Sequence, residues 1–291
     1  MADVPAGVEV GRVPVAEGVS LHVHRRRGRT DLAPFLLVHG LASNLRMWDG
    51  VAEGLAAAGH PVAAVDLRGH GRSDKPDGGY DFATVSADLG RVVEALGYDR
   101  PIVAGQSWGG NVVVDLAARG AVPVRGIACV DGGWIDLRRF ETWEACEKAM
   151  APPRTAGLPA DDFEAMMRGR RPDWPEAGIQ GALACFEVRA DGTIAPWLTF
   201  ERHLMILRAM WEQRVGELFP AVDVPVLLLP CADGGAPDWE ARKREEVGAA
   251  SAALAMSRTV WFRASHDVHA QKPGEVVEVL LRSVADGFFR S

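Results

Sequence analysis

The chain has few of the features that mark metal, disulfide, nucleic-acid or membrane proteins. Its four cysteines, at positions 129, 146, 185 and 231, are scattered singly without C-x-x-C spacing, so neither a zinc site nor a disulfide framework is predicted. Acidic residues outnumber basic ones by 39 to 32, which argues against nucleic acid as a partner, because phosphate binding needs a basic face. No apolar run approaches a membrane span in length.

The start of the sequence, residues 1–7, has neither the basic residues nor the apolar core of a signal peptide. We therefore expect a cytoplasmic protein that acts on a small molecule, with no membrane or nucleic-acid partner. The sequence indicates no metal and no organic cofactor. It leaves the oligomeric state open between a monomer and a homodimer.

The pattern that is present is an alternation of short apolar runs with amphipathic segments. With 291 residues, 48% of them hydrophobic, the chain can bury a large core. The alternation predicts an α/β fold with a mostly parallel sheet covered on both faces. The expected strands are 8–15, 19–24, 35–38, 62–65, 101–104, 126–130, 224–229 and 259–262. Between the fourth and fifth, a helix with apolar residues from Val85 to Leu96 is expected to end at Gly97.

The rhythm breaks between residues 134 and 220, where too many residues intervene for a normal connection. We expect a core domain made of residues 1–133 and 221–291, with residues 134–220 inserted as a helical cap. The insertion is rich in tryptophan and methionine, which suggests the roof of an apolar pocket. Trp134 is a candidate pocket residue, although any one of these tryptophans can equally pack the insertion against the sheet.

Ser107 lies in the sequence I-V-A-G-Q-S-W-G-G-N, residues 102–111. Here an apolar strand runs into a G-x-S-x-G turn with a helix-like stretch behind it. Such a turn is so tight that small residues must flank the serine, and its hydroxyl is left pointing out at the edge of the sheet. This context makes Ser107 a candidate nucleophile.

A second turn, His39-Gly40-Leu41, ends the strand 35–38. The backbone N–H of Leu41 is expected to face the space above Ser107 and to form an oxyanion hole with the N–H of Trp108. His39 itself is expected to hold this turn rather than to act as a base, and it is also a candidate for the pocket wall.

Four motifs together resemble the α/β-hydrolase fold superfamily in its capped single-chain form. They are V-H-G-L at 38–41, D-L-R-G-H-G-R-S-D-K-P at 66–76, G-Q-S-W-G-G at 105–110 and S-H-D-V-H-A-Q-K-P at 265–273. The resemblance implies a core sheet with an inserted cap and a catalytic triad in the chain order nucleophile, acid, histidine. For residues 66–76 we expect a loop-organising network around Asp66, Arg68 and His70 rather than catalytic chemistry.

The resemblance implies that His266 is the general base, because it follows the last strand and precedes Pro273 at the family's spacing. His269, on the same loop, is the rival, and the match gives it a supporting or pocket role. Ser265 stands where glycine usually precedes this histidine. On the insertion, His203 is expected on the surface of a helix, with the alternative that it reaches the substrate.

Two aspartates compete for the acid position. Asp233 follows the strand 224–229 and matches the family's acid, although Pro230 replaces the usual glycine three residues earlier. Asp131 ends the preceding strand, where some relatives carry their acid. We take Asp233 as the expected acid and Asp131 as the alternative. Either would accept the N–H of His266, fix its tautomer and stabilise the imidazolium.

The resulting hypothesis is a serine hydrolase that cleaves a carboxylic ester, lactone or thioester of a mainly apolar small molecule through an acyl-enzyme. The alternatives on the same triad are a carbon–carbon bond hydrolase or an acyltransferase, and a ligand-binding, receptor-like protein is the alternative outside catalysis. Serine argues against haloalkane or epoxide hydrolysis, since attack would leave an ether that water does not readily open.

Overall fold

The central element of the computed structural model, which describes residues 7–235 and 237–290, is an eight-stranded sheet. Its strand order is β1-β2-β4-β3-β5-β6-β9-β10. The strands β1 and β2 form an antiparallel hairpin, β2 is antiparallel to β4, and all pairs from β4 to β10 are parallel. Their bounds are β1 Glu9–Ala16, β2 Val19–Arg26, β3 Phe35–Val38, β4 Val62–Val65, β5 Ile102–Gln106, β6 Gly126–Val130, β9 Val226–Leu229 and β10 Ser257–Thr259. The expected α/β class and mostly parallel sheet are confirmed.

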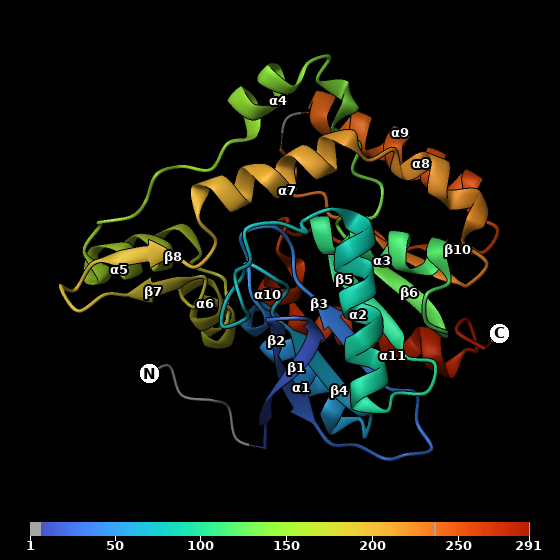
Figure 1. Cartoon of the computed structure of the whole chain (residues 1–291). Coiled ribbons are helices and arrows are strands. Elements are labelled where there is room, and N and C mark those ends of the chain that lie inside the picture. The colour runs from blue at the N-terminus through green and yellow to red at the C-terminus, as the bar shows by residue number, and fades with distance from the viewer. Residues whose placement is uncertain (1–6, 236, 291) are drawn as a thin grey trace.

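Helices cover both faces of this sheet (Figure 1). On one face Val38 packs among residues of α2 (Phe82–Leu96), α3 (Trp108–Arg119) and α9 (Pro237–Ala253). On the other face its neighbour Leu37 packs among residues of α1 (Asp49–Ala57), α10 (Val268–Gln271) and α11 (Pro273–Ala285). Because successive strand residues point to opposite faces, a strand covered on both sides must be apolar throughout. This is why the parallel strands read as unbroken apolar runs.

The helix α2 shows how local sequence sets an element's ends. Asp81 accepts a hydrogen bond from the Thr84 backbone N–H at 2.9 Å, which satisfies one of the free donors at the helix start. Gly97 ends the helix with a φ of 64°, a left-handed conformation that glycine adopts without steric cost. Both the predicted helix and its glycine cap are confirmed.

The last strand lies earlier than expected. β10 spans Ser257–Thr259 instead of residues 259–262. The chain nevertheless stays beside β9, because the Val260 N–H donates to the Leu228 carbonyl at 2.9 Å and the Phe262 N–H donates to the Pro230 carbonyl at 2.9 Å. Pro230 has no N–H to return, which interrupts the regular ladder at this point.

The sequence predicts a helical cap between β6 and β9. The structure corrects this prediction, because the segment contains a β-hairpin as well as helices. It contains α4 Trp143–Met150, α5 Ala160–Arg170, α6 Glu176–Leu183, a hairpin of β7 Phe186–Val188 and β8 Ile194–Pro196, then α7 Phe200–Glu212 and α8 Val215–Leu218. Short 3-10 turns occur at Leu137–Arg139 and Phe219–Ala221, and in the core at Leu45–Trp48. The turn of the hairpin contains Asp191 and Gly192, a strong hairpin signal.

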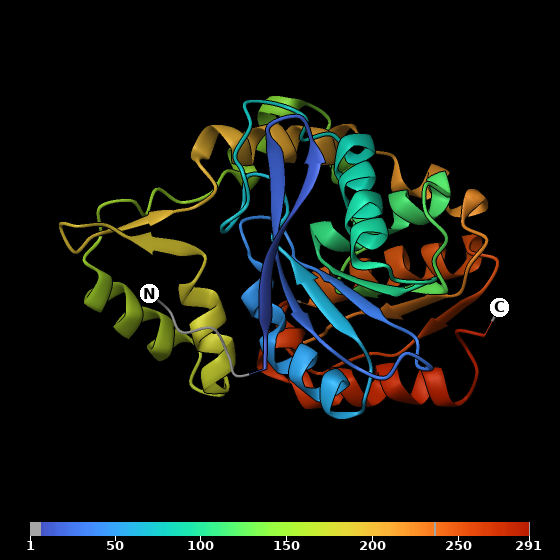
Figure 2. The same ribbon diagram turned by 60° about the horizontal axis from the view of Figure 1, so that its bottom comes forward.

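This segment has two parts in space. Figure 2 shows α5, α6 and the β7–β8 hairpin standing out beside the core, whereas α7 crosses over the end of the sheet. The part of the insertion that contains α7 therefore lies next to the carboxyl ends of the parallel strands, where open α/β sheets place their ligands (Figure 1). In residues 7–235 and 237–290, no helix is both long and apolar enough to cross a membrane.

Candidate active site

Ser107 occupies a strained turn between β5 and α3. Its backbone has φ 53° and ψ −119°, a conformation that costs a residue with a side chain roughly 1–3 kcal/mol. The turn is held because the Ser107 N–H donates to the Val130 carbonyl at 2.9 Å and its carbonyl accepts from the Gly110 N–H at 2.9 Å. Such strain persists only where the surroundings enforce it, which is typical of a functional position.

Glycines leave the room that this turn requires. A Cβ on Gly105 would collide with the backbone of Gly109, the second residue of α3. A Cβ on Gly132, in the loop after β6, would collide with the backbone of Ser107 itself. The loop that carries Asp131 therefore packs directly against the candidate nucleophile.

His266 is bound by Asp131. Its Nδ1 lies 2.6 Å from Oδ2 of Asp131, which follows β6 and is 3% exposed. Because a carboxylate accepts only, Nδ1 carries the proton and Nε2 is left free to accept one. Oδ1 of Asp131 also accepts the Cys231 N–H at 2.8 Å. An imidazole with its proton on Nδ1 and a free Nε2 is the tautomer that a general base for Ser107 needs.

The prediction that Asp233 holds His266 is wrong in its geometry. Asp233 is exposed, and its Oδ1 accepts the N–H of Gly235 at 3.1 Å within its own turn. The reason lies at Cys231, whose N–H points to Asp131 while the chain beyond it turns out toward solvent. The alternative acid, Asp131, makes the contact that was expected of Asp233.

The charges of this pair support each other. Burial raises the pKa of Asp131, but its hydrogen bond from His266 and the nearby Lys243 outweigh that effect and hold the pKa below its usual range. Burial lowers the pKa of His266, but the hydrogen bond to Asp131 together with the negative charges of Asp267 and Asp131 outweighs that effect, so the pKa is raised overall. The His266 side chain is still 51% exposed, which leaves its ring accessible.

Two further side chains join this site that the sequence did not single out. Lys243, on α9, places Nζ 2.9 Å from both carboxylate oxygens of Asp131. Gln106, the residue before the serine, donates from Nε2 to the His266 carbonyl at 3.2 Å and to Oδ1 of Asp267 at 3.4 Å. Gln106 thus ties the end of β5 to the histidine loop. The sequence could have indicated Gln106, because it lies inside the G-Q-S-W-G motif. It could not have indicated Lys243, which is 112 residues from Asp131 and lies in no motif of the site.

The two expected oxyanion donors lie on backbone next to Ser107. Trp108 is the first residue of α3, so its N–H has no acceptor within the helix. Leu41 follows Gly40, where a Cβ would lie 3.1 Å from the Ser107 Cβ. The next residue, Ala42, has a left-handed φ of 56°, which sets the direction of this loop. The pairing of these amides in an oxyanion hole stays a prediction.

Histidines fix the loop that carries Leu41. The Ala42 N–H donates to Nε2 of His70 at 3.2 Å, so Nδ1 of His70 donates to the Arg68 carbonyl at 2.9 Å. The Leu67 N–H donates to Nε2 of His39 at 3.0 Å, and Nδ1 of His39 donates to the Gly40 carbonyl at 2.7 Å. Burial lowers the pKa of both histidines, which keeps them neutral. The turn-holding role expected of His39 is confirmed, and the ring has no nitrogen left for substrate.

The expected network in residues 66–76 is also present. Asp66 accepts hydrogen bonds from Nδ1 of His22 at 2.9 Å and from the Leu45 N–H at 2.8 Å. Arg68 donates to both carboxylate oxygens of Asp88, at 2.6 and 2.8 Å, in a buried pair. These contacts anchor the loop below the candidate oxyanion hole to β2 and to α2.

A cavity of about 340 Å³ lies beside this loop. Ala42 and Ser43 line it from the core, and Leu198, Phe200 and His203 line it from the insertion. His203 is 8% exposed and lines this cavity, so the expectation that it lies on a helix surface is wrong, and the alternative that it reaches the substrate stays a prediction. Burial lowers its pKa to about 4, which makes it a neutral wall residue at pH 7.

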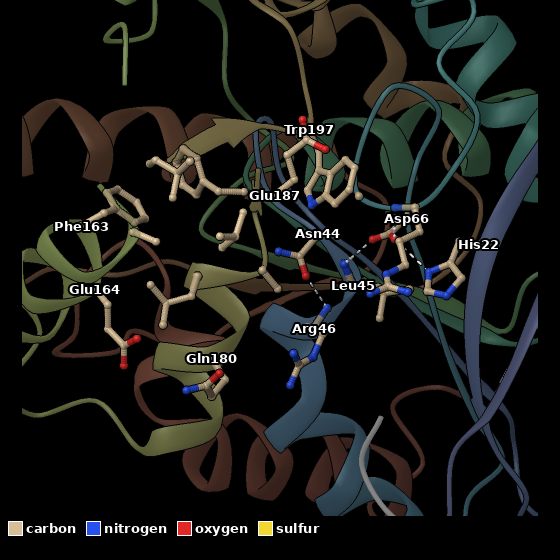
Figure 3. Close-up of a pocket in the computed structure, with 18 of the residues that line it drawn as sticks. His22, Asn44, Leu45, Arg46, Asp66, Phe163, Glu164, Gln180, Glu187 and Trp197 are labelled. Atoms are coloured by element: carbon tan, nitrogen blue, oxygen red, sulfur yellow. Dashed lines mark hydrogen bonds and ion pairs between the residues drawn. The ribbon is translucent and has the colours of Figure 1, made fainter. Parts of the chain in front are cut away.

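A larger cavity, about 620 Å³, is lined by residues of both the core and the insertion (Figure 3). In Figure 3, Asp66 and His22 of the core lie opposite Phe163 and Glu164 of α5, with Trp197 above them. Neither Ser107 nor His266 lines this space. Neither residue lines the smaller cavity, which borders the candidate site through Ala42, the residue after Leu41.

Trp134 and His269, the other predicted pocket residues, line neither cavity. Trp134 is 5% exposed and packs in the core with Trp108. His269 is fully buried, with its ring centre 4.5 Å from that of Trp48. Burial lowers the pKa of His269 to about 3, so it is neutral and contributes packing. Across residues 7–235 and 237–290, no cluster of histidine, cysteine and carboxylate side chains has the arrangement of a metal site.

Comparisons with known proteins agree with this fold. Residues 33–173 match the family model described as alpha/beta hydrolase fold. A 206-residue stretch is 27% identical to the AB hydrolase superfamily protein YisY of Bacillus subtilis (strain 168), covering 67% of this chain and 72% of that protein. A 110-residue stretch is 34% identical to a non-heme chloroperoxidase of Streptomyces lividans, covering 38% of this chain and 40% of that protein.

Solved structures extend the likeness to nearly the whole chain. The crystal structure of E-2-(acetamidomethylene)succinate hydrolase matches with a TM-score of 0.75 at 23% identity, covering 96% of this chain and 99% of that one. At this identity the match shows the fold, and the reaction has to be argued from the site.

Proposed function

Because the chain belongs to the α/β-hydrolase fold superfamily, we propose that it is a serine hydrolase that cleaves a carboxylic ester, lactone or thioester of a mainly apolar small molecule. The observation that carries the proposal is the 2.6 Å contact between Nδ1 of His266 and Oδ2 of Asp131. It holds an imidazole with a free Nε2 on a loop that Gln106 ties to the serine turn. Nucleophile, base and acid are then Ser107, His266 and Asp131.

In the first half of the reaction, Oγ of Ser107 forms a bond to the substrate's carbonyl carbon while its proton passes to Nε2 of His266. The carbonyl oxygen becomes negative and is stabilised by the N–H groups of Leu41 and Trp108. The bond to the leaving alcohol or thiol then breaks, and that group takes the proton from His266. The product is an acyl-enzyme on Ser107.

In the second half, water replaces the leaving group. His266 takes a proton from water, whose oxygen bonds to the acyl carbon, and the bond to Ser107 breaks as Oγ recovers a proton from His266. Asp131 stabilises the imidazolium in both halves and stays ionised. Each cycle consumes one water and releases an acid and an alcohol or thiol.

The identity of the nucleophile narrows the reaction. If Ser107 attacked an alkyl halide or an epoxide, the product would be a serine ether, which has no carbonyl for water to attack. An acyl-serine does have one and is opened by the same base. Ser107 therefore favours acyl transfer to water over haloalkane or epoxide hydrolysis.

The cavity next to Ala42 supports an apolar acyl group. Its walls from the insertion include Leu198 and Phe200, and the imidazole of His203 that joins them is neutral at pH 7. Arg154 and Arg189 also line this cavity, so an ammonium group placed there would lose its hydration and meet like charge. We therefore infer that the acyl group is mainly apolar and carries no positive charge.

The direct test is steady-state hydrolysis of nitrophenyl esters from acetate to decanoate by the wild type, Ser107→Ala and His266→Ala. The proposal predicts sustained turnover by the wild type, with kcat/KM at least about 10³-fold lower in each variant. A single stoichiometric burst without turnover would instead favour a ligand-binding protein. Turnover that survives Ser107→Ala would overturn the proposed mechanism.

A further inference from the structure

We propose that Lys243 is a positioning residue of this site, which clamps the carboxylate of Asp131 and so determines how His266 is oriented and how readily it accepts a proton. The inference rests on the proposed function of the triad. Lys243 lies on α9, outside the motifs that mark the site in the sequence.

The ammonium of Lys243 is fully used. Its Nζ lies 2.9 Å from Oδ1 of Asp131, 2.9 Å from Oδ2 and 2.9 Å from the carbonyl oxygen of Cys231. An ammonium has three protons to donate, so each is matched by one acceptor. The side chains of Lys243 and Asp131 are only 10% and 1% exposed. The ring of Trp239 lies 3.9 Å from Nζ on the same helix and completes its surroundings.

This contact fixes the orientation of the carboxylate. Oδ1 of Asp131 accepts from the Cys231 N–H and from Lys243, and Oδ2 accepts from Lys243 and from His266. Without Lys243, the Cys231 N–H would be the one donor other than His266 itself to hold the carboxylate against rotation. The clamp therefore aims Oδ2 at Nδ1 of His266, which preorganises the base.

Lys243 also offsets part of the negative charge that His266 meets. The charged groups facing His266 are Asp131 from the end of β6, Asp267 on its own loop and Lys243 from α9. Glu246, three residues along α9, interacts electrostatically with Lys243, and the neutral His269 interacts with His266 from α10. A cation beside Asp131 opposes protonation of the imidazole. Removal of that cation should let His266 hold its proton to a higher pH.

The test compares Lys243→Met with Arg244→Met, a matched control that removes one charge from the adjacent, exposed position of α9. The NMR signal of a His266 ring proton is followed as a function of pH in the protein without substrate. The signal is assigned because it is missing from the spectrum of His266→Gln. The midpoint should rise by about one pH unit in Lys243→Met and stay unchanged in Arg244→Met. The acid limb of kcat/KM should move with it, and the maximum should fall about tenfold.

Lys243→Arg keeps the charge and provides a second variant if Lys243→Met does not fold. Its titration midpoint should stay close to that of the wild type. The proposal is overturned if Lys243→Met lowers the melting temperature without moving the His266 midpoint, or if Lys243→Arg moves it as far as Lys243→Met does. Because the titration needs no substrate, it still decides the role of Lys243 if esterase activity is absent, which separates failure of this inference from failure of the proposed function.

Discussion

Two Asp-Gly-Gly turns follow neighbouring strands of the sheet and have opposite fates. Asp131 comes directly after β6, and its N–H still donates to the Leu229 carbonyl of β9 at 3.0 Å. Asp233 comes four residues after the end of β9, where it is exposed and accepts a hydrogen bond from the Gly235 N–H within its own turn. Both turns carry the same three residues, so the local sequence does not decide which aspartate contacts His266. The distance of the aspartate from the strand end and the hydrogen-bond donors around its carboxylate decide it.

The buried turn needs compensation that the exposed turn does not. Taking the carboxylate of Asp131 out of water is costly, and the Cys231 N–H, Lys243 and His266 together replace that water. Asp233 keeps its hydration and needs no such partners. Replacing the carboxylate by an amide should therefore lower activity and stability strongly at Asp131 and only slightly at Asp233.

The largest expected effect comes from exchanging the two carboxylates for amides one at a time. Asp131→Asn should lower kcat/KM for a nitrophenyl ester by about 10³-fold, because the amide can present the wrong group to Nδ1 of His266. Asp233→Asn should lower it by less than about threefold. Steady-state kinetics on both variants check this, and equal losses would contradict the assignment of Asp131.

The second effect is on stability. Asp131→Asn leaves the ammonium of Lys243 buried without a carboxylate, so the free energy of unfolding should fall by about 3 kcal/mol. Adding Lys243→Met should restore about half of that loss, since the unpaired charge is then gone. Asp233→Asn should change it by less than about 0.5 kcal/mol. Urea unfolding of the four proteins measures this, and no recovery in the double variant would argue against a buried pair.

A third, smaller effect comes from the opposite side of Ser107. His70→Phe removes the acceptor for the Ala42 N–H but keeps a ring beside Trp108, which His70 faces with ring centres 5.5 Å apart. The loop that carries Leu41 should loosen, and kcat should fall about tenfold with little change in the pH profile. His70→Gln, which keeps an acceptor, is the control. A shifted acid limb in His70→Phe would show that the two sides of the serine are not independent.

The smallest effect concerns the pH dependence of the wild type, namely the pH at which kcat/KM falls on the acid side of the profile. Catalysis needs neutral His266, whose pKa is raised by Asp131 despite partial burial. Activity should therefore fall as the pH drops through a value above the ordinary 6.5 or so. The stabilisation from the charged pair has the opposite dependence, present at low pH and lost as pH rises through the same pKa. A pH profile of kcat/KM checks this, and a limb below pH 6 would contradict it. Asp233→Asn should leave the limb in place.

Much of this site could be predicted because its signals are local. The serine turn, the H-G turn and the histidine loop each lie at the end of one strand, and short motifs mark them. Asp131 and Asp233 could not be separated in this way, since both precede two glycines and both follow buried strands. Lys243 was out of reach of sequence reasoning because its contact with Asp131 joins distant elements.

Two other misses had usable signals. Asp191 and Gly192 marked the β7–β8 turn within the insertion. His203 shares the spacing of Ile206, Leu207 and Met210, which all lie on the buried face of α7. That 3–4 spacing predicts a buried position for His203.

The central claim, that Ser107 carries an acyl group during turnover, is tested most directly by intact-mass and peptide mass spectrometry of the protein quenched while it hydrolyses a slow nitrophenyl ester. The account predicts a transient adduct of the acyl mass on Ser107, absent from Ser107→Ala and long-lived in Asp131→Asn. Turnover without any adduct, or an adduct on another residue, would contradict it.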